Sequence, residues 1–88
     1  MPNVSFTEDA AQSLDKLPKT IKARIIELIA RLSRWPNVSG AKALSGTLAG
    51  HFRLRTGDYR LQFRIESSPQ GEEIVIEQVG HRDGFYED

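Results

Sequence analysis

The sequence contains no cysteine, which excludes disulfide bonds and thiolate metal ligands. Its two histidines, His51 and His81, stand thirty residues apart, which is a poor metal-binding signature. Ser-His-Asp groupings and glycine-rich phosphate loops are missing too, so we expect neither a metal nor another cofactor. No apolar run approaches the roughly 20 residues that span a bilayer, and the N-terminus lacks a secretory signal pattern. We therefore expect a soluble cytoplasmic protein that has no membrane partner.

The chain also has no net charge at pH 7, because its 88 residues carry twelve basic and twelve acidic side chains. Their distribution along the chain is uneven. Between Lys16 and Arg64 there are eleven Lys and Arg residues but only two acids, Glu27 and Asp58, whereas both flanks are acidic. This asymmetry indicates a basic surface that meets an anion, although a solvated helix face with an acidic tail would show the same charges. The length fits a single domain over residues 1–88.

Hydrophobic periodicity divides the chain into helical and extended parts. Residues 3–6 are typical of a short strand, residues 10–17 of a helix that follows an N-capping Thr7, and residues 21–32 of a second amphipathic helix. After an irregular connection the period changes to two, which predicts a hairpin and a last strand. The order predicts an α+β fold, in which a two-helix hairpin packs on a mainly antiparallel four-stranded sheet (β-α-α-β-β-β). In the last strand Ile74, Val75 and Ile76 are consecutive, which indicates cover on both faces.

The central hairpin, HFRLRTGDYRLQF, has a register that its turn can set. If Gly57-Asp58 is a two-residue loop, then Leu54 pairs with Leu61 and Arg55 with Arg60, so apolar residues share one face and arginines the other. A three-residue loop would oppose Leu54 and Arg60 and break both faces. The two-residue loop is therefore favoured.

In this register Arg53, Arg55 and Arg60 crowd one face of the sheet, and His51 and Arg64 are paired beyond them. Like charges that face each other destabilise a sheet, although long arginine stems can also serve only to cover it. An anionic ligand bound on this face would offset the repulsion among the arginines, and the arginines would in turn bind the ligand. Because the planar guanidinium suits phosphate, the pattern predicts a phosphate-binding surface.

Two segments resemble a known family. The hairpin from Leu44 to Phe63, with its G-D-Y-R turn, and the segment V-G-H-R-D-G-F-Y from Val79 to Tyr86 are similar to the RelE branch of the RelE/ParE toxin superfamily. The element order matches as well, so the resemblance covers nearly the whole chain. It implies a toxin of a type II toxin–antitoxin system that acts as a ribosome-dependent endoribonuclease and cleaves mRNA in the A site. In that reaction, which needs no metal, a 2′-hydroxyl attacks the adjacent phosphorus and leaves a 2′,3′-cyclic phosphate.

The same resemblance implies the catalytic residues. The basic pair of the first hairpin strand corresponds to Arg53 and Arg55, the arginine after the turn to Arg60, the one near the C-terminus to Arg82, and the stacking or proton-transferring tyrosine to Tyr86. Positions that are often lysine in the family are arginines here, and arginine cannot act as a general base at ordinary pH. A base would have to be His81, His51 or Tyr86. Asp83 stands where many relatives are basic, which weakens the local attraction for phosphate.

Partners and alternatives follow from the resemblance as well. It implies a cognate antitoxin that covers the basic face and forms a hetero-oligomer with the toxin, and it implies the ribosome with its mRNA. Two other functions share the fold: a ParE-like toxin that inhibits DNA gyrase, and a non-catalytic family member that acts as a binding module. The set of Arg60, Arg82 and Tyr86 favours RNA cleavage.

Overall fold

The computed structural model describes residues 3–81, apart from the side chain of Ser68. Along these residues the elements are β1 Asn3–Phe6, α1 Glu8–Asp15, α2 Lys19–Arg31, η1 Leu32–Arg34, β2 Lys42–Ala43, η2 Gly46–Leu48, β3 His51–Thr56, β4 Tyr59–Ser68 and β5 Gly71–His81. The labels η1 and η2 denote short 3-10 helices. No helix in this part of the chain is long and apolar enough to cross a membrane.

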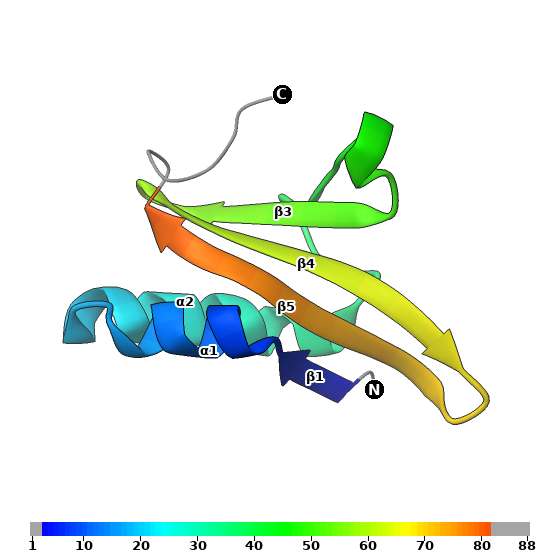
Figure 1. Ribbon diagram of the computed structural model, residues 1–88, viewed down its shortest axis with the longest axis horizontal. Coiled ribbons are helices and arrows are strands. Elements are labelled where there is room, and N and C mark those ends of the chain that lie inside the picture. The colour runs from blue at the N-terminus through cyan, green and yellow to red at the C-terminus, as the bar shows by residue number, and fades with distance from the viewer. Residues whose placement is uncertain (1–2, 82–88) are drawn as a thin grey trace.

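The strands form one twisted sheet in the order β1-β5-β4-β3-β2 (Figure 1). β1 runs parallel to β5, and the other neighbours are antiparallel. Both helices lie on one side of the sheet, which leaves the other side as an open face (Figure 1). The predicted α+β fold is therefore confirmed. The structure adds a fifth strand, β2, inside the segment expected to be an irregular connection.

Helix α1 begins where its sequence indicates, and both helices bury apolar side chains against the sheet. Thr7 is the N-cap of α1, and its Oγ1 accepts a hydrogen bond from the backbone N–H of Ala10 at 3.2 Å. Ala10 and, on α2, Ile25 and Leu28 are buried. Within each helix the residues that contact the core recur at helical spacing, so each helix presents one apolar stripe to the sheet.

The core lies between that stripe and the inner side of the sheet. Leu54, Leu61 and Phe63 point into it from the hairpin, and the ring of Phe63 contacts both Trp35 and Phe52. The consecutive residues Ile74, Val75 and Ile76 are all buried, with no side chain more than 5% exposed. The expected cover on both faces of β5 is therefore confirmed.

The β3–β4 hairpin has the register that its turn predicts. Leu54 pairs with Leu61, and Arg55 pairs with Arg60. Gly57 has a φ of 59°, whereas no described non-glycine residue, Asp58 included, has a positive φ. A first turn residue with positive φ is typical of a II′ hairpin turn, whose twist matches that of the strands.

Replacing Gly57 by L-alanine should therefore destabilise the fold. Holding a non-glycine residue at this positive φ costs about 1–3 kcal/mol, and no neighbouring atom lies close enough to add a steric clash. Chemical denaturation of the variant should show that loss in the free energy of unfolding. A semisynthetic chain with D-alanine at this position should keep the parent stability, because a D-residue favours positive φ. An equal loss in both chains would contradict the account of the turn.

Candidate functional site

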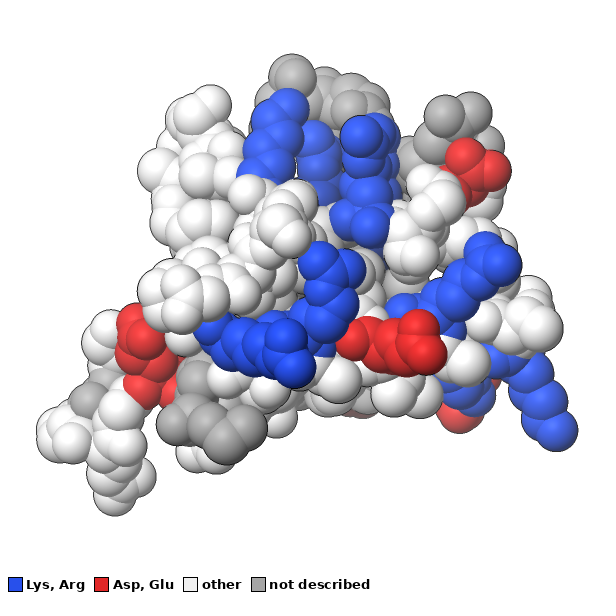
Figure 2. Space-filling model, turned by 180° about the vertical axis from the view of Figure 1, so that it is seen from behind, with Lys and Arg blue, Asp and Glu red and all other residues white. Residues whose placement is uncertain are grey.

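The open face carries a cavity whose lining is basic. Its volume is about 230 Å³, and it is lined by Gly40, Lys42, Arg53, Arg55 and Arg60. We call these four charged residues the basic cluster. Figure 2 shows lysine and arginine side chains at the end of the molecule where β3 lies in Figure 1, with others across the rest of the same view. The three hairpin arginines thus emerge on one side of the sheet, as the alternation predicts.

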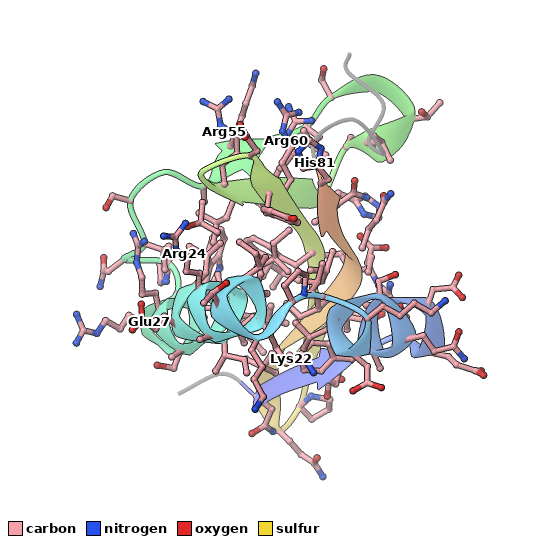
Figure 3. All side chains as sticks on the ribbon, turned by 90° about the vertical axis from the view of Figure 1, so that its left-hand side faces the viewer. Lys22, Arg24, Glu27, Arg55, Arg60 and His81 are labelled. Atoms are coloured by element: carbon pink, nitrogen blue, oxygen red, sulfur yellow. The ribbon has the colours of Figure 1, made fainter. Side chains whose placement is uncertain are left out.

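Pairing across three strands assembles the basic cluster. Arg55 faces Arg60 across β3 and β4, and Lys42 of β2 faces Arg53 of β3. Cross-strand partners share a sheet face, and so do residues two apart on one strand. The four cations are therefore neighbours because of the register. In Figure 3 Arg55 and Arg60 lie together at one end of the sheet, whereas Lys22, Arg24 and Glu27 lie on α2.

Arg60 is the most enclosed member of the cluster. It is only 7% exposed, whereas Arg55 and Lys42 are exposed. An enclosed side chain has little freedom to move, so the surrounding residues restrict the position of this guanidinium. An anion that enters the cavity would meet positive charge that is already positioned.

A second cavity, of about 660 Å³, adjoins the basic cluster. Gly40 and Arg55 line both cavities, and the second is also lined by Arg31 of α2. Arg31 Nη2 donates a hydrogen bond to the carbonyl oxygen of Ser39 at 3.1 Å. This contact ties the loop before β2 to α2, and so it holds the wall that the two cavities share.

A charged network occupies the open face beside the cluster. Glu77 accepts hydrogen bonds from His51 Nδ1 at 2.5 Å and from Arg64 Nη1 at 3.0 Å. Arg64 Nε also donates to Glu66 at 2.9 Å. The hydrogen bonds with Glu66 and then Glu77 raise the pKa of Arg64. His51 and Arg64 therefore hold the Glu77 carboxylate in place.

A β-bulge brings Glu77 into this network. Gln62 pairs with Gln78, but Phe63 pairs with Ile76, so Glu77 is the extra residue on β5. Such an extra residue bends the strand and redirects its side chain. Thr7 Oγ1 donates to the backbone carbonyl of Glu77 at 3.3 Å, which ties the bulge to the start of α1.

The two histidines lie on different faces of the sheet. His51 is two residues from Arg53 on β3 and points to the open face, where it meets Glu77. His81 pairs with Tyr59, and their ring centroids lie 5.3 Å apart in an edge-to-face arrangement. Because Tyr59 packs against the core cluster, His81 is on the helix side of its strand rather than on the face of the basic cluster. The predicted site residues Arg82 and Tyr86 lie outside the described residues.

Two residues of this region were not singled out from the sequence. Lys42 lies in a Gly- and Ser-rich segment, where a two-residue strand has no readable period. Glu77 follows three consecutive apolar residues in β5, and nothing local marks the bulge. The described residues also contain no group of three side chains suited to hold a metal ion.

Known proteins resemble this chain in sequence and in architecture. The family model described as the ParE toxin of the type II toxin-antitoxin system, parDE, matches residues 4–84. Toxin RelG of Mycobacterium tuberculosis is 42% identical over 84 residues, which cover 94% of this chain and 93% of RelG. The crystal structure of the toxin–antitoxin complex RelBE2 from the same organism matches with 40% identity and a TM-score of 0.77, over 93% of this chain and 100% of that one.

A more distant match is the isolated Escherichia coli RelE toxin. Its TM-score is 0.74 at 16% identity, over 92% of this chain and 84% of that chain, which shows a shared fold. Because the family model spans nearly the whole chain and RelG is 42% identical to it, the protein belongs to the RelE/ParE superfamily, the toxins of type II toxin–antitoxin systems.

Proposed function

We propose that this toxin is a ribosome-dependent endoribonuclease that cleaves mRNA in the A site, in the cytoplasm, without a metal. The observation that carries the proposal is the cavity lined by Lys42, Arg53, Arg55 and Arg60. Attack of a 2′-hydroxyl on the adjacent phosphorus places negative charge on the non-bridging oxygens. Positioned guanidinium groups stabilise such charge most effectively in an enclosed site.

Of the two histidines, His51 is the better placed to act as the general base. A carboxylate only accepts hydrogen bonds, so Nδ1 carries the proton that bonds to Glu77. This leaves Nε2 of the neutral ring as an acceptor, oriented by a third group as in other nucleophile-activating sites. His51 also shares the open face with Arg53, whereas His81 does not.

The step can be written with its protons. The 2′-hydroxyl gives its proton to His51 Nε2 while its oxygen forms a bond to phosphorus. The bond between phosphorus and the 5′ oxygen breaks, and that oxygen takes up a proton from water. The products are a 2′,3′-cyclic phosphate and a 5′-hydroxyl. Arg60 and its neighbours compensate the charge of the phosphoryl group, and the resemblance adds Arg82 to them and Tyr86 as a base-stacking group.

An antitoxin is the second proposed partner. The matching structures include toxin–antitoxin complexes, among them RelBE2 and the intact Escherichia coli RelBE complex. The basic cluster would suit an acidic antitoxin segment that folds on binding. By covering the open face, such a segment would block access of RNA to the cavity.

Lys42 should contribute a phosphate contact that acts through charge alone. We expect Lys42→Ala to weaken binding of single-stranded RNA regardless of its sequence and to reduce the salt slope of log K by about 0.7. Fluorescence anisotropy with a 2′-fluoro RNA, which cannot be cleaved, measures both quantities. Lys19→Ala is the matched control, because Lys19 is exposed at the start of α2. An unchanged slope in Lys42→Ala would remove this residue from the interface.

Induced expression without an antitoxin tests the proposed function directly. New transcript 5′ ends within translated codons, absent when translation is blocked before induction, are the expected result. The matched family model is described as ParE, which favours a second candidate, inhibition of DNA gyrase. DNA breaks with intact transcripts would support that candidate. Normal growth with neither lesion would indicate a non-catalytic binding module.

A further inference from the structure

A row of side chains crosses the open face from the basic cluster to α1. Lys42, Arg53, Gln62 and Gln78 are successive cross-strand partners on β2, β3, β4 and β5. Partners share a sheet face, and adjacent strands lie about 4.8 Å apart, so Gln78 lies about 10 Å from Arg53. The row begins with two cations and ends with two neutral amides. The side chains of the open face therefore change from positively charged to neutral along this row.

A cavity lies at the amide end of this row. Its volume is about 490 Å³, and its lining consists of Glu77 and Gln78 of β5 together with Asp9, Gln12, Ser13 and Lys16. The first three of the latter belong to α1, and Lys16 is its C-cap. They follow the spacing i, i+3, i+4 and i+7, so they form one stripe of the helix. The stripe faces β5 at the bulge.

The lining can form hydrogen bonds without repelling RNA strongly. The Glu77 carboxylate is bonded to both His51 and Arg64, so its charge is compensated within the network. In the net charge of the lining, the positive charge of Lys16 cancels the negative charge of Asp9. The uncharged polar groups of the lining are amides and a hydroxyl, which can both donate and accept hydrogen bonds. Such groups read the edges of unstacked bases in single-stranded RNA, whereas cations bind phosphate without reading sequence.

We propose that Gln62, Gln78 and the α1 stripe form a subsite that binds and reads one base of the RNA substrate, next to the phosphate held by the basic cluster. This inference rests on the proposed function, because it takes that phosphate to be the one under attack. Gln78 contacts the edge of the base. Gln62 lies between Gln78 and Arg53, and so it links the base site to the phosphate site. The subsite is therefore a source of sequence preference in cleavage.

The test replaces each amide by an apolar group of similar size. In Gln62→Leu and Gln78→Leu, mapped 5′ ends should show that the preference for one base at one position beside the cut falls by about tenfold. Gln70→Leu is the matched control, because Gln70 lies between β4 and β5, outside this row. It should cut with the preference of the parent chain. A parental preference in both subsite variants would overturn the inference.

A binding measurement separates this inference from the proposed function. A panel of 2′-fluoro tetranucleotides that differ at one base is titrated into each chain. The parent should bind one member about tenfold better than the others, and Gln78→Leu should bind all members alike. Cleavage by the parent without base discrimination in either assay overturns the subsite alone. Absence of cleavage by the parent overturns the proposed function, and the subsite for its substrate with it.

Discussion

Replacing Arg60 by glutamine is expected to slow mRNA cleavage by about 10²- to 10³-fold, the usual effect of removing one preorganised donor that stabilises transition-state charge. Arg60 is the member of the basic cluster whose position packing determines most strongly, since it is 7% exposed. An exposed cation reorganises with the solvent, whereas an enclosed guanidinium is oriented before the charge develops. Its loss should therefore affect the chemical step more than RNA binding. The measurement is single-turnover cleavage on programmed ribosomes, with binding followed separately.

A matched arginine and a conservative change make the Arg60 result interpretable. Arg24→Gln removes the same group from α2, outside the basic cluster, and should leave the cleavage rate within about twofold of the parent. Arg60→Lys keeps the charge but loses the planar fork, so its rate should lie between those of the parent and Arg60→Gln. Circular dichroism and thermal melting establish that each variant is folded. A folded Arg60→Gln that cleaves at the parental rate would remove Arg60 from the proposed site.

Replacing His51 by alanine is expected to lower the cleavage rate by about 10²- to 10⁴-fold, the range typical of a lost general base. The loss should appear in single-turnover cleavage on programmed ribosomes rather than in RNA binding, because a general base acts only in the chemical step. A folded His51→Ala that cleaves at the parental rate would exclude His51 as the base.

Glu77→Gln tests the orienting role separately. The amide oxygen can still accept a hydrogen bond from His51 Nδ1, but the negative charge that stabilises the proton taken up by the ring during the reaction is gone. Cleavage should therefore be slower than in the parent, while the folded structure stays intact. A change in stability without a change in the cleavage rate would indicate that Glu77 is only structural. If His81→Ala slows cleavage and His51→Ala does not, the base is His81 instead.

The hairpin shows how far local reasoning reaches into the candidate site. The alternation of Arg53 and Arg55 with apolar neighbours, combined with the length of the Gly57-Asp58 turn, predicts the register that the structure contains. Both features are local, because side-chain alternation and turn geometry involve only residues close in sequence. The shared face of Arg53, Arg55 and Arg60 could therefore be predicted before any long-range contact was known.

Long-range pairing decided the rest of the site. Lys42 enters the basic cluster only because β2 pairs with β3, and Glu77 reaches His51 only because β5 has a bulge opposite Gln62 and Phe63. His81 follows the arginine hairpin in the family pattern, yet its strand places it beside Tyr59. None of these positions has a local signal, because each depends on the register between segments far apart in the chain.

Local patterns in the chain thus predict the α+β class, the helix faces, the hairpin register and a basic surface. Periodicity and turn chemistry encode these features through the burial of apolar side chains, which each segment expresses in its own composition. Three features follow from long-range contacts alone: which residues surround the cavity, which histidine shares its face, and where α1 meets the end of the Gln62–Gln78 row. Those relations depend on the balance of packing across the whole sheet, where a single extra residue redirects a side chain.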